Sequence, residues 1–179
     1  MAAFDDMYQQ VVTVNGVSKS FAMTGWRLGY IGAPEWIAKA CTKIQGQFTS
    51  GASSISQRAA LAAVSSSPNV ILPMKEAFLE RRNFMLKELR NIKGIKINEP
   101  KGAFYLFPDV SELFGQHFDG KTVNNADDLC LFLLEEAKVA LVTGNAFGSP
   151  NCIRISYAAS MEQLKEAVYR IKSAISQLN

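Results

Sequence analysis

Lys19 and Arg27, eight positions apart, are the two side chains of this sequence best suited to act on one ligand. They lie in the largely apolar run Ser18-Lys-Ser-Phe-Ala-Met-Thr-Gly-Trp-Arg-Leu-Gly-Tyr30. A lysine among apolar neighbours loses its proton more readily and becomes an amine nucleophile. An arginine can donate two parallel hydrogen bonds to a phosphate. The pair therefore suits a carbonyl compound that carries a phosphate group.

Pyridoxal phosphate is the common cofactor of that description. The run also resembles the cofactor-lysine signature of class I (fold-type I, aspartate aminotransferase-like) aminotransferases, and later segments resemble that family in the same order. The resemblance implies that Lys19 is the catalytic residue, which forms the Schiff base and moves a proton between substrate and cofactor, and that Arg27 holds the cofactor phosphate. Composition alone leaves open that both charges are solvated side chains beside a buried strand.

Arg154 is a third candidate, inside the apolar run Ile153-Arg-Ile-Ser-Tyr157. An arginine in such a strand needs an anionic partner or a route to water, so an edge-strand arginine that faces solvent stays possible. The segment is similar to the substrate-arginine strand of the same family. That similarity implies that Arg154 forms a bidentate pair with the α-carboxylate of the amino acid substrate.

Two flanking segments also resemble the family. Residues 100–107 are similar to the strand that brings an aromatic residue close to the substrate, with Phe104 and Tyr105 as candidates. Residues 144–148 resemble the loop before the arginine strand. Residues 48–54 resemble a segment that reaches the neighbouring subunit's site; here it holds small polar residues where one dicarboxylate-specific branch has an arginine. We expect aspartate or a related amino acid as donor and 2-oxoglutarate as acceptor.

The sequence departs from the family pattern before Lys19. Gly16 stands three positions before the lysine, where several members have a phosphate-binding hydroxyl, and this also disfavours a Ser-Lys hydrolase. Asp5 and Asp6 do not match the aspartate that pairs with the pyridine nitrogen in the family. The chain thus resembles the C-terminal half of an aminotransferase. We predict that the full-length parent is a transaminase and that this fragment is weakly active or inactive alone.

The remaining pattern predicts the elements that position these residues. The implied fold is α/β: residues 1–70 form the end of the PLP-transferase large domain, and residues 71–179 form the C-terminal small domain. Asn125 and the Ser160–Gln163 capping box predict two helix starts. Residues 45–56 favour a linker or a loop that lines a site. The expected strands cover residues 7–17, 28–33, 95–97, 102–107, 139–142 and 153–156, and the expected helices start near residues 34, 57, 70, 126 and 161.

Composition limits the classes of protein that fit. The 179 residues are 48% hydrophobic and 20% charged, with a net charge of +3 whose positive residues are scattered, so no nucleic-acid partner is expected. No apolar run approaches the roughly 20 residues that cross a bilayer, and no membrane partner is expected. The three cysteines form no CxxC pair, which favours reduced thiols in the cytoplasm and no metal site. The first six residues lack the features of a signal peptide.

Three interpretations remain. The first is an aminotransferase half whose parent is a homodimer, with amino acids and 2-oxo acids as substrates. The second is another fold-type I enzyme, such as a β-lyase, because Arg154 indicates an α-amino acid but not the reaction. The third is a non-catalytic folded fragment or dimerisation partner.

Overall fold

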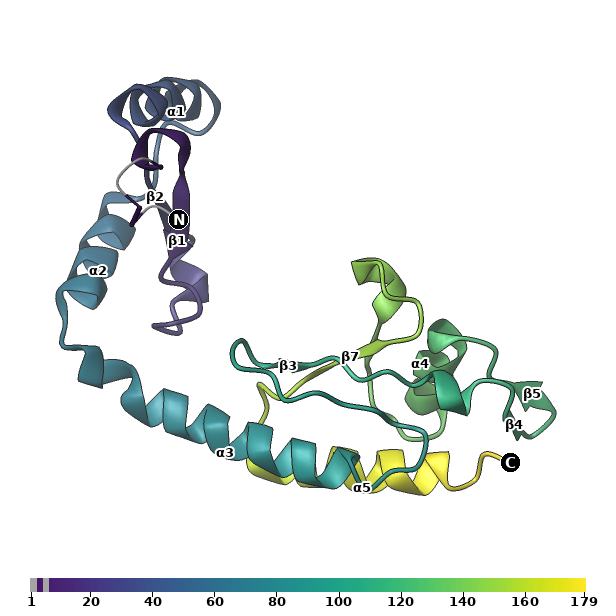
Figure 1. Ribbon diagram of the computed structural model, residues 1–179. Coiled ribbons are helices and arrows are strands. Elements are labelled where there is room, and N and C mark those ends of the chain that lie inside the picture. The colour runs from purple at the N-terminus through teal and green to yellow at the C-terminus, as the bar shows by residue number, and fades with distance from the viewer. Residues whose placement is uncertain (1–2, 5–6) are drawn as a thin grey trace. The chain divides into compact units, whose positions relative to one another are not determined.

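The computed structural model of the chain describes residues 3–4 and 7–179 (Figure 1). Asp5 and Asp6 lie outside the described residues. The chain divides into two units, Met1–Pro73 and Met74–Asn179. Each unit combines helices with strands, which confirms the α/β class. No helix among the described residues is long and apolar enough to cross a membrane.

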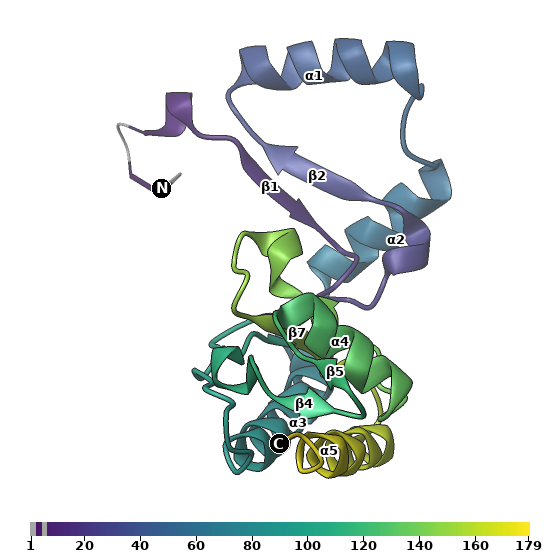
Figure 2. The same ribbon diagram turned by 90° about the vertical axis from the view of Figure 1, so that its right-hand side faces the viewer.

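The first unit is a β-hairpin followed by two helices. Strands β1 and β2 pair antiparallel, and Gly16 lies opposite Gly29 at the end that leads into the connecting loop. Helix α1 begins after Pro34, as predicted, and Figure 2 shows it standing apart from the hairpin. The elements of this unit are η1 (Tyr8–Gln10), β1 (Thr13–Gly16), η2 (Thr24–Trp26), β2 (Gly29–Gly32), α1 (Glu35–Phe48), α2 (Ser54–Ser65) and η3 (Pro68–Ile71).

Two predictions for this unit are wrong. The strand expected over residues 7–17 covers only Thr13–Gly16, because a 3₁₀ turn comes first. This strand is also not buried, since Val14 is 76% exposed. Helix α1 likewise contains no buried residue. Residues 45–56 are not one loop, because α1 continues to Phe48 and α2 starts at Ser54. Apolar side chains that sequence reasoning assigned to a core therefore face outward.

The second unit has a three-stranded antiparallel sheet in the order β3-β7-β6. A separate hairpin pairs β4 with β5, with His117 opposite Thr122. The elements of this unit are α3 (Leu72–Leu89, which begins at the unit boundary), β3 (Tyr105–Leu106), η4 (Ser111–Leu113), β4 (His117–Phe118), β5 (Lys121–Thr122), α4 (Ala126–Glu135), β6 (Val142–Thr143), η5 (Gly144–Phe147), β7 (Ile153–Ser156) and α5 (Met161–Ile175).

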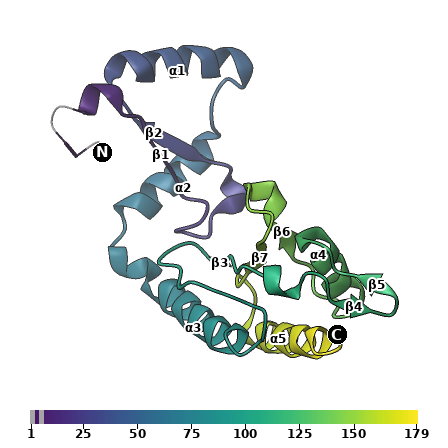
Figure 3. The same ribbon diagram turned by 45° about the vertical axis from the view of Figure 1, so that its right-hand side comes forward.

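One face of this sheet packs on the core and the other is open. Leu106, Ile153 and Ile155 are buried and belong to one apolar cluster with α3, α4 and α5. Helices α3 and α5 lie side by side on that side of the strands, where the side chains of Glu88 and Lys172 form an ion pair (Figure 1). The yellow-green turn η5 lies on the other side (Figure 3). The open face carries the alternate residues of β7.

Local capping signals were predicted correctly, whereas strand lengths were not. The Asn125 side chain accepts a hydrogen bond from the Asp128 amide at 2.9 Å, and Ser160 with Gln163 forms the predicted capping box. The strand expected over residues 95–97 is only an isolated bridge between Lys96 and Asp109. The strand expected over residues 102–107 is reduced to β3, and the one expected over residues 139–142 overlaps β6 only at Val142, while β7 has its predicted bounds.

Candidate active site

The loop between β1 and β2 carries both Lys19 and Arg27. It starts with a turn in which the Phe21 amide donates to the Val17 carbonyl and the Ala22 amide donates to the Lys19 carbonyl, at 3.3 and 3.2 Å. Val17 is fully buried, whereas Lys19 is exposed. The apolar enclosure expected around Lys19 is therefore wrong for this chain, because the turn places the valine inside and the lysine outside.

Arg27 adopts a backbone conformation that is unfavourable for its residue type. Its φ of 52° lies in the left-handed region, which a side chain with a Cβ rarely enters. Its Nη1 donates a 2.8 Å hydrogen bond to the carbonyl of Thr24, three residues back. Ala22, in the same loop, has a φ of 54°. Strained residues of this kind concentrate at binding sites, where the surrounding contacts hold them in place.

Close backbone packing at the mouth of the loop favours glycine, most clearly at position 29. A Cβ built on Gly29 would lie 3.2 Å from the carbonyl oxygen of Asn15, and one on Gly16 would lie 3.4 Å from the carbonyl oxygen of Leu28. The two ends of the loop can therefore approach closely. This holds the amine of Lys19 and the guanidinium of Arg27 on a single closed loop, and both side chains are exposed. An amine and a guanidinium carried on one loop are donor types that fit a phosphorylated carbonyl compound.

Arg154 belongs to the second unit and lies on the open face of the sheet. Because β7 is the central strand, the edge-strand alternative is wrong. The guanidinium carbon lies over the rings of Tyr105 and Phe147, 4.6 Å from each ring centroid. Arg154 is half-buried and forms no ion pair or side-chain hydrogen bond with any residue that the structure describes. Its N–H groups are thus available to an external anion.

Phe147 is a site residue that sequence reasoning missed. It ends η5, the turn between β6 and β7, and its ring also contacts Phe107 edge-on with the centroids 6.0 Å apart. The available signal was a single aromatic residue between Gly144 and Gly148, in the turn that precedes the strand of the arginine. Its position opposite Arg154 depends on strand pairing, which that local pattern does not reveal.

Gly144 fixes the start of this turn. Its amide donates to the Cys152 carbonyl at 2.7 Å, and its carbonyl accepts from the Ser149 amide at 3.0 Å. A Cβ at this position would lie 2.1 Å from the Ser149 oxygen and 2.4 Å from the Cys152 oxygen. Only glycine fits so close an approach. The turn that carries Phe147 is therefore tied to the residue that precedes β7.

The two aromatic candidates from residues 100–107 have different surroundings. The Phe104 ring lies 5.9 Å from that of Phe78 on α3 and packs against the core cluster. Tyr105 points to the open face, because it lies opposite Ser156 in the strand register. Of the two, Tyr105 is the residue that contacts Arg154.

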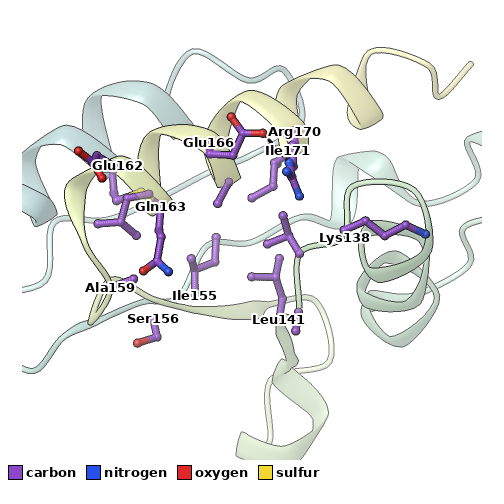
Figure 4. A pocket seen from close by; sticks show the side chains of 15 residues that line it. Lys138, Leu141, Ile155, Ser156, Ala159, Glu162, Gln163, Glu166, Arg170 and Ile171 are labelled. Carbon is purple, nitrogen blue, oxygen red and sulfur yellow. Dashed lines mark hydrogen bonds and ion pairs between the residues drawn. The ribbon is translucent and has the colours of Figure 1, made fainter.

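A groove of about 710 Å³ lies elsewhere in the second unit, between α5 and residues 138–141 (Figure 4). Leu141, Ile155 and Ile171 form part of an apolar floor, and the Glu166–Arg170 ion pair of 2.7 Å lies at its edge. Neither Arg154 nor Phe147 lines this groove. It is therefore separate from the arginine and its two aromatic rings.

The sequence and the structure both match one family of enzymes. Residues 2–171 match the family described as aminotransferase class I and II. Over 97% of its length, the chain is 53% identical to a bifunctional aspartate aminotransferase and glutamate/aspartate-prephenate aminotransferase of Petunia hybrida, of which it covers 37%.

Solved structures give the same result. The crystal structure of the aspartate aminotransferase of Rhizobium meliloti is 42% identical over 96% of this chain, with a TM-score of 0.93, and the chain covers 43% of it. An aromatic aminotransferase of Pyrococcus horikoshii OT3 is 35% identical over 98% of this chain, with a TM-score of 0.88 and 45% of its length covered. The chain thus spans about two fifths of the length of these relatives. It belongs to the class I and II aminotransferase family.

Proposed function

We propose that this chain is the C-terminal part of a pyridoxal-phosphate-dependent transaminase that transfers the amino group of aspartate, or a related amino acid, to 2-oxoglutarate. The observation that carries the proposal is the closed loop that holds Lys19 and Arg27, in a chain of the aminotransferase family. In this proposal the first unit is the end of the cofactor-binding large domain, and the second is the small domain.

Class I aminotransferases depend on pyridoxal phosphate, and the donors present fit that group. Lys19 Nζ is the amine that would bond to its aldehyde carbon, and the guanidinium of Arg27 would bind its phosphate. The Nη1 bond to Thr24 orients Arg27 and leaves its other N–H groups available to the phosphate. When bound, pyridoxal phosphate supplies an electron sink that weakens the bonds of the substrate α-carbon. As a free amine, Lys19 Nζ would take up the proton of the substrate α-carbon and deliver it to the aldehyde-derived carbon of the cofactor, which is the proton shift that transamination needs.

Arg154 would orient the substrate. Its N–H groups would donate two parallel hydrogen bonds to the α-carboxylate, which fixes the direction of the bond to be broken. The Petunia and Rhizobium relatives are named for aspartate, which supports a dicarboxylic donor. The Pyrococcus relative is named for aromatic substrates, so an aromatic amino acid is the second candidate.

The parent's assembly and location are also proposals. We propose a homodimer in the cytoplasm, without nucleic-acid or membrane partners. The large apolar side chains that the first unit exposes, among them Trp36 at 67% and Phe48 at 83%, support burial against further protein. The three free cysteines, Cys41, Cys130 and Cys152, support a reducing compartment.

The proposal is tested by adding pyridoxal phosphate to the purified chain, reducing with borohydride and mapping the modified lysine by mass. We expect selective labelling of Lys19 that is weakened by free phosphate and by Arg27→Gln. Lys39→Arg and Arg58→Gln, at exposed positions of the same unit, are matched controls that leave labelling unchanged. Labelling spread evenly over many lysines would support a non-catalytic fragment.

The parent's reaction needs a separate assay. Turnover of aspartate that requires a 2-oxo acid supports a transaminase, whereas turnover without one indicates a lyase. We expect the 179-residue chain alone to show little or no turnover, because it covers only about two fifths of its relatives. Full transaminase turnover by this chain would contradict that expectation.

A further inference from the structure

Arg154 is held by aromatic rings and not by acidic side chains. It is half-buried on the open face of the sheet, and the described part of the chain offers it no carboxylate within ion-pair distance. The rings of Tyr105 and Phe147 each lie 4.6 Å from its guanidinium carbon. Aromatic faces stabilise a guanidinium without occupying its N–H groups. The cation is therefore stabilised while its donors stay available.

The two rings come from opposite flanks of β7. Tyr105 lies on β3 and shares the face of Arg154, because its register partner is Ser156, two residues along β7. Phe147 follows β6, the neighbour on the other side, where Val142 is the register partner of Arg154. The arginine is thus contacted from both adjacent parts of the sheet. Movement of its long side chain toward either flank is restricted.

We propose that Tyr105 and Phe147 are positioning residues that clamp the guanidinium of Arg154 in one orientation and so set its affinity for the carboxylate of the substrate. The inference rests on the proposed function in naming a substrate carboxylate as the ligand. Rings over the guanidinium leave its edge for ligand binding, and a planar carboxylate accepts two parallel N–H bonds at that edge. A tetrahedral anion also carries oxygens out of the guanidinium plane, and an aromatic ring that lies over the cation disfavours oxygens there.

A hydrogen bond outside the clamp fixes Phe147. The ring is 48% exposed, so packing alone does not hold it. Its turn begins at the tightly packed Gly144, and the side-chain amide of Asn145 donates to the carboxylate of Asp127 in the first turn of α4. Asp127 and Asn145 therefore act on Arg154 through Phe147. This connection joins the N-terminus of α4 to the candidate carboxylate site.

Nuclear magnetic resonance of the ¹⁵N-labelled 179-residue chain tests the clamp directly. The Arg154 Nε–H signal, identified by its loss in Arg154→Lys, is expected to be displaced by the ring currents of the two aromatic rings. Titration with acetate is expected to move this signal, and phosphate at equal ionic strength to move it less. Phe147→Leu should weaken acetate binding by about two- to fivefold and remove part of the ring-current displacement.

Three further variants separate positioning from general structural damage. Phe147→Tyr keeps a ring and should retain the wild-type acetate affinity. Phe118→Leu removes a ring that contacts Phe132, with centroids 5.3 Å apart, and should leave the Arg154 signal unchanged. Asn145→Ala leaves both clamp rings intact but releases the turn, and should weaken acetate binding.

The clamp is overturned if Phe147→Leu binds acetate as the wild type does, or if acetate does not move the wild-type Arg154 signal. Equal displacement of that signal by phosphate and acetate would overturn the preference for planar anions. The cofactor role is tested separately by labelling of Lys19, which lies in the first unit. Loss of selective Lys19 labelling with an intact clamp would reject the cofactor role and keep the clamp.

Discussion

The backbone of the lysine loop has two left-handed residues that are not glycine. Ala22 and Arg27 have φ values of 54° and 52°, and such residues are each unfavourable by about 1–3 kcal/mol. The sequence from Ser18 to Tyr30 does not predict these left-handed conformations, because Gly25 and Gly29 could have formed the turns instead. The strained residue Arg27 is the one that would bind the phosphate. This backbone conformation fixes the direction of its side chain and lowers the stability of the loop.

Burial raises the pKa of the Cys130 thiol to about 11, and the neighbouring charge of Asp127 acts in the same direction. At pH 8 only about one thiol in a thousand is then a reactive thiolate. We expect native-state alkylation at pH 8 to modify the exposed Cys41 long before Cys130, and the Cys130 rate to rise until the pH passes about 11. Mass mapping over time gives both rates. Equal rates at the two cysteines would contradict this burial.

Gly144→Ala is expected to destabilise the second unit strongly. The new Cβ would lie 2.1 Å from the Ser149 oxygen, a backbone atom that cannot move away without breaking the turn. We expect the free energy of unfolding to fall by about 3 kcal/mol, measured by urea unfolding. Gly102→Ala is the matched control, because a Cβ there meets nothing within 4 Å, and its effect should stay within about 0.5 kcal/mol.

At the scale of the elements, local sequence signals predicted where helices begin but not where the short strands lie. The capping box of α5 needs only Ser160 and Gln163, so four consecutive residues contain the whole signal. The expected strand at 102–107 alternates correctly but is interrupted by Ala103 with a φ of 58°, and only Tyr105–Leu106 pairs with β7. A strand exists only where a partner is available, and the partner of β3 lies about fifty residues later in the chain.

Ser160→Ala tests the contribution of that capping box to α5. The Ser160 hydroxyl accepts a 3.2 Å hydrogen bond from the Gln163 amide, which otherwise lacks a partner at the helix start. We expect the free energy of unfolding to fall by about 1 kcal/mol in urea unfolding followed by circular dichroism. Ser173→Ala makes the same atomic change at an exposed position inside α5 and should be neutral within about 0.5 kcal/mol. An equal effect of both substitutions would reject a capping role.

At the scale of the whole molecule, the sequence predicted the family correctly and suggested three charged candidates, but it did not predict the packing around them. Lys19 and Arg27 could be proposed because a continuous run contains them. The contact of Phe147 and Tyr105 with Arg154 depends on the strand order β3-β7-β6, which no local pattern contains. The exposure of the β1–β2 hairpin was also not predicted. An apolar strand sequence predicts burial, but it does not show which residues cover the strand.

The two units are expected to differ in their resistance to local opening. The second unit encloses an apolar cluster in which Leu106 and Leu133 are 0% exposed, whereas β1 and α1 of the first contain no buried residue. Opening the first unit therefore exposes little additional apolar surface. In hydrogen exchange measured by mass spectrometry on the whole chain, amides of β7 and α4 should exchange roughly a thousandfold more slowly than those of β1 and α1. Similar protection in both units would mean that contacts beyond its own strands stabilise the hairpin. The exposed side chains of Val14 and Trp36 would then not support an interface with further protein.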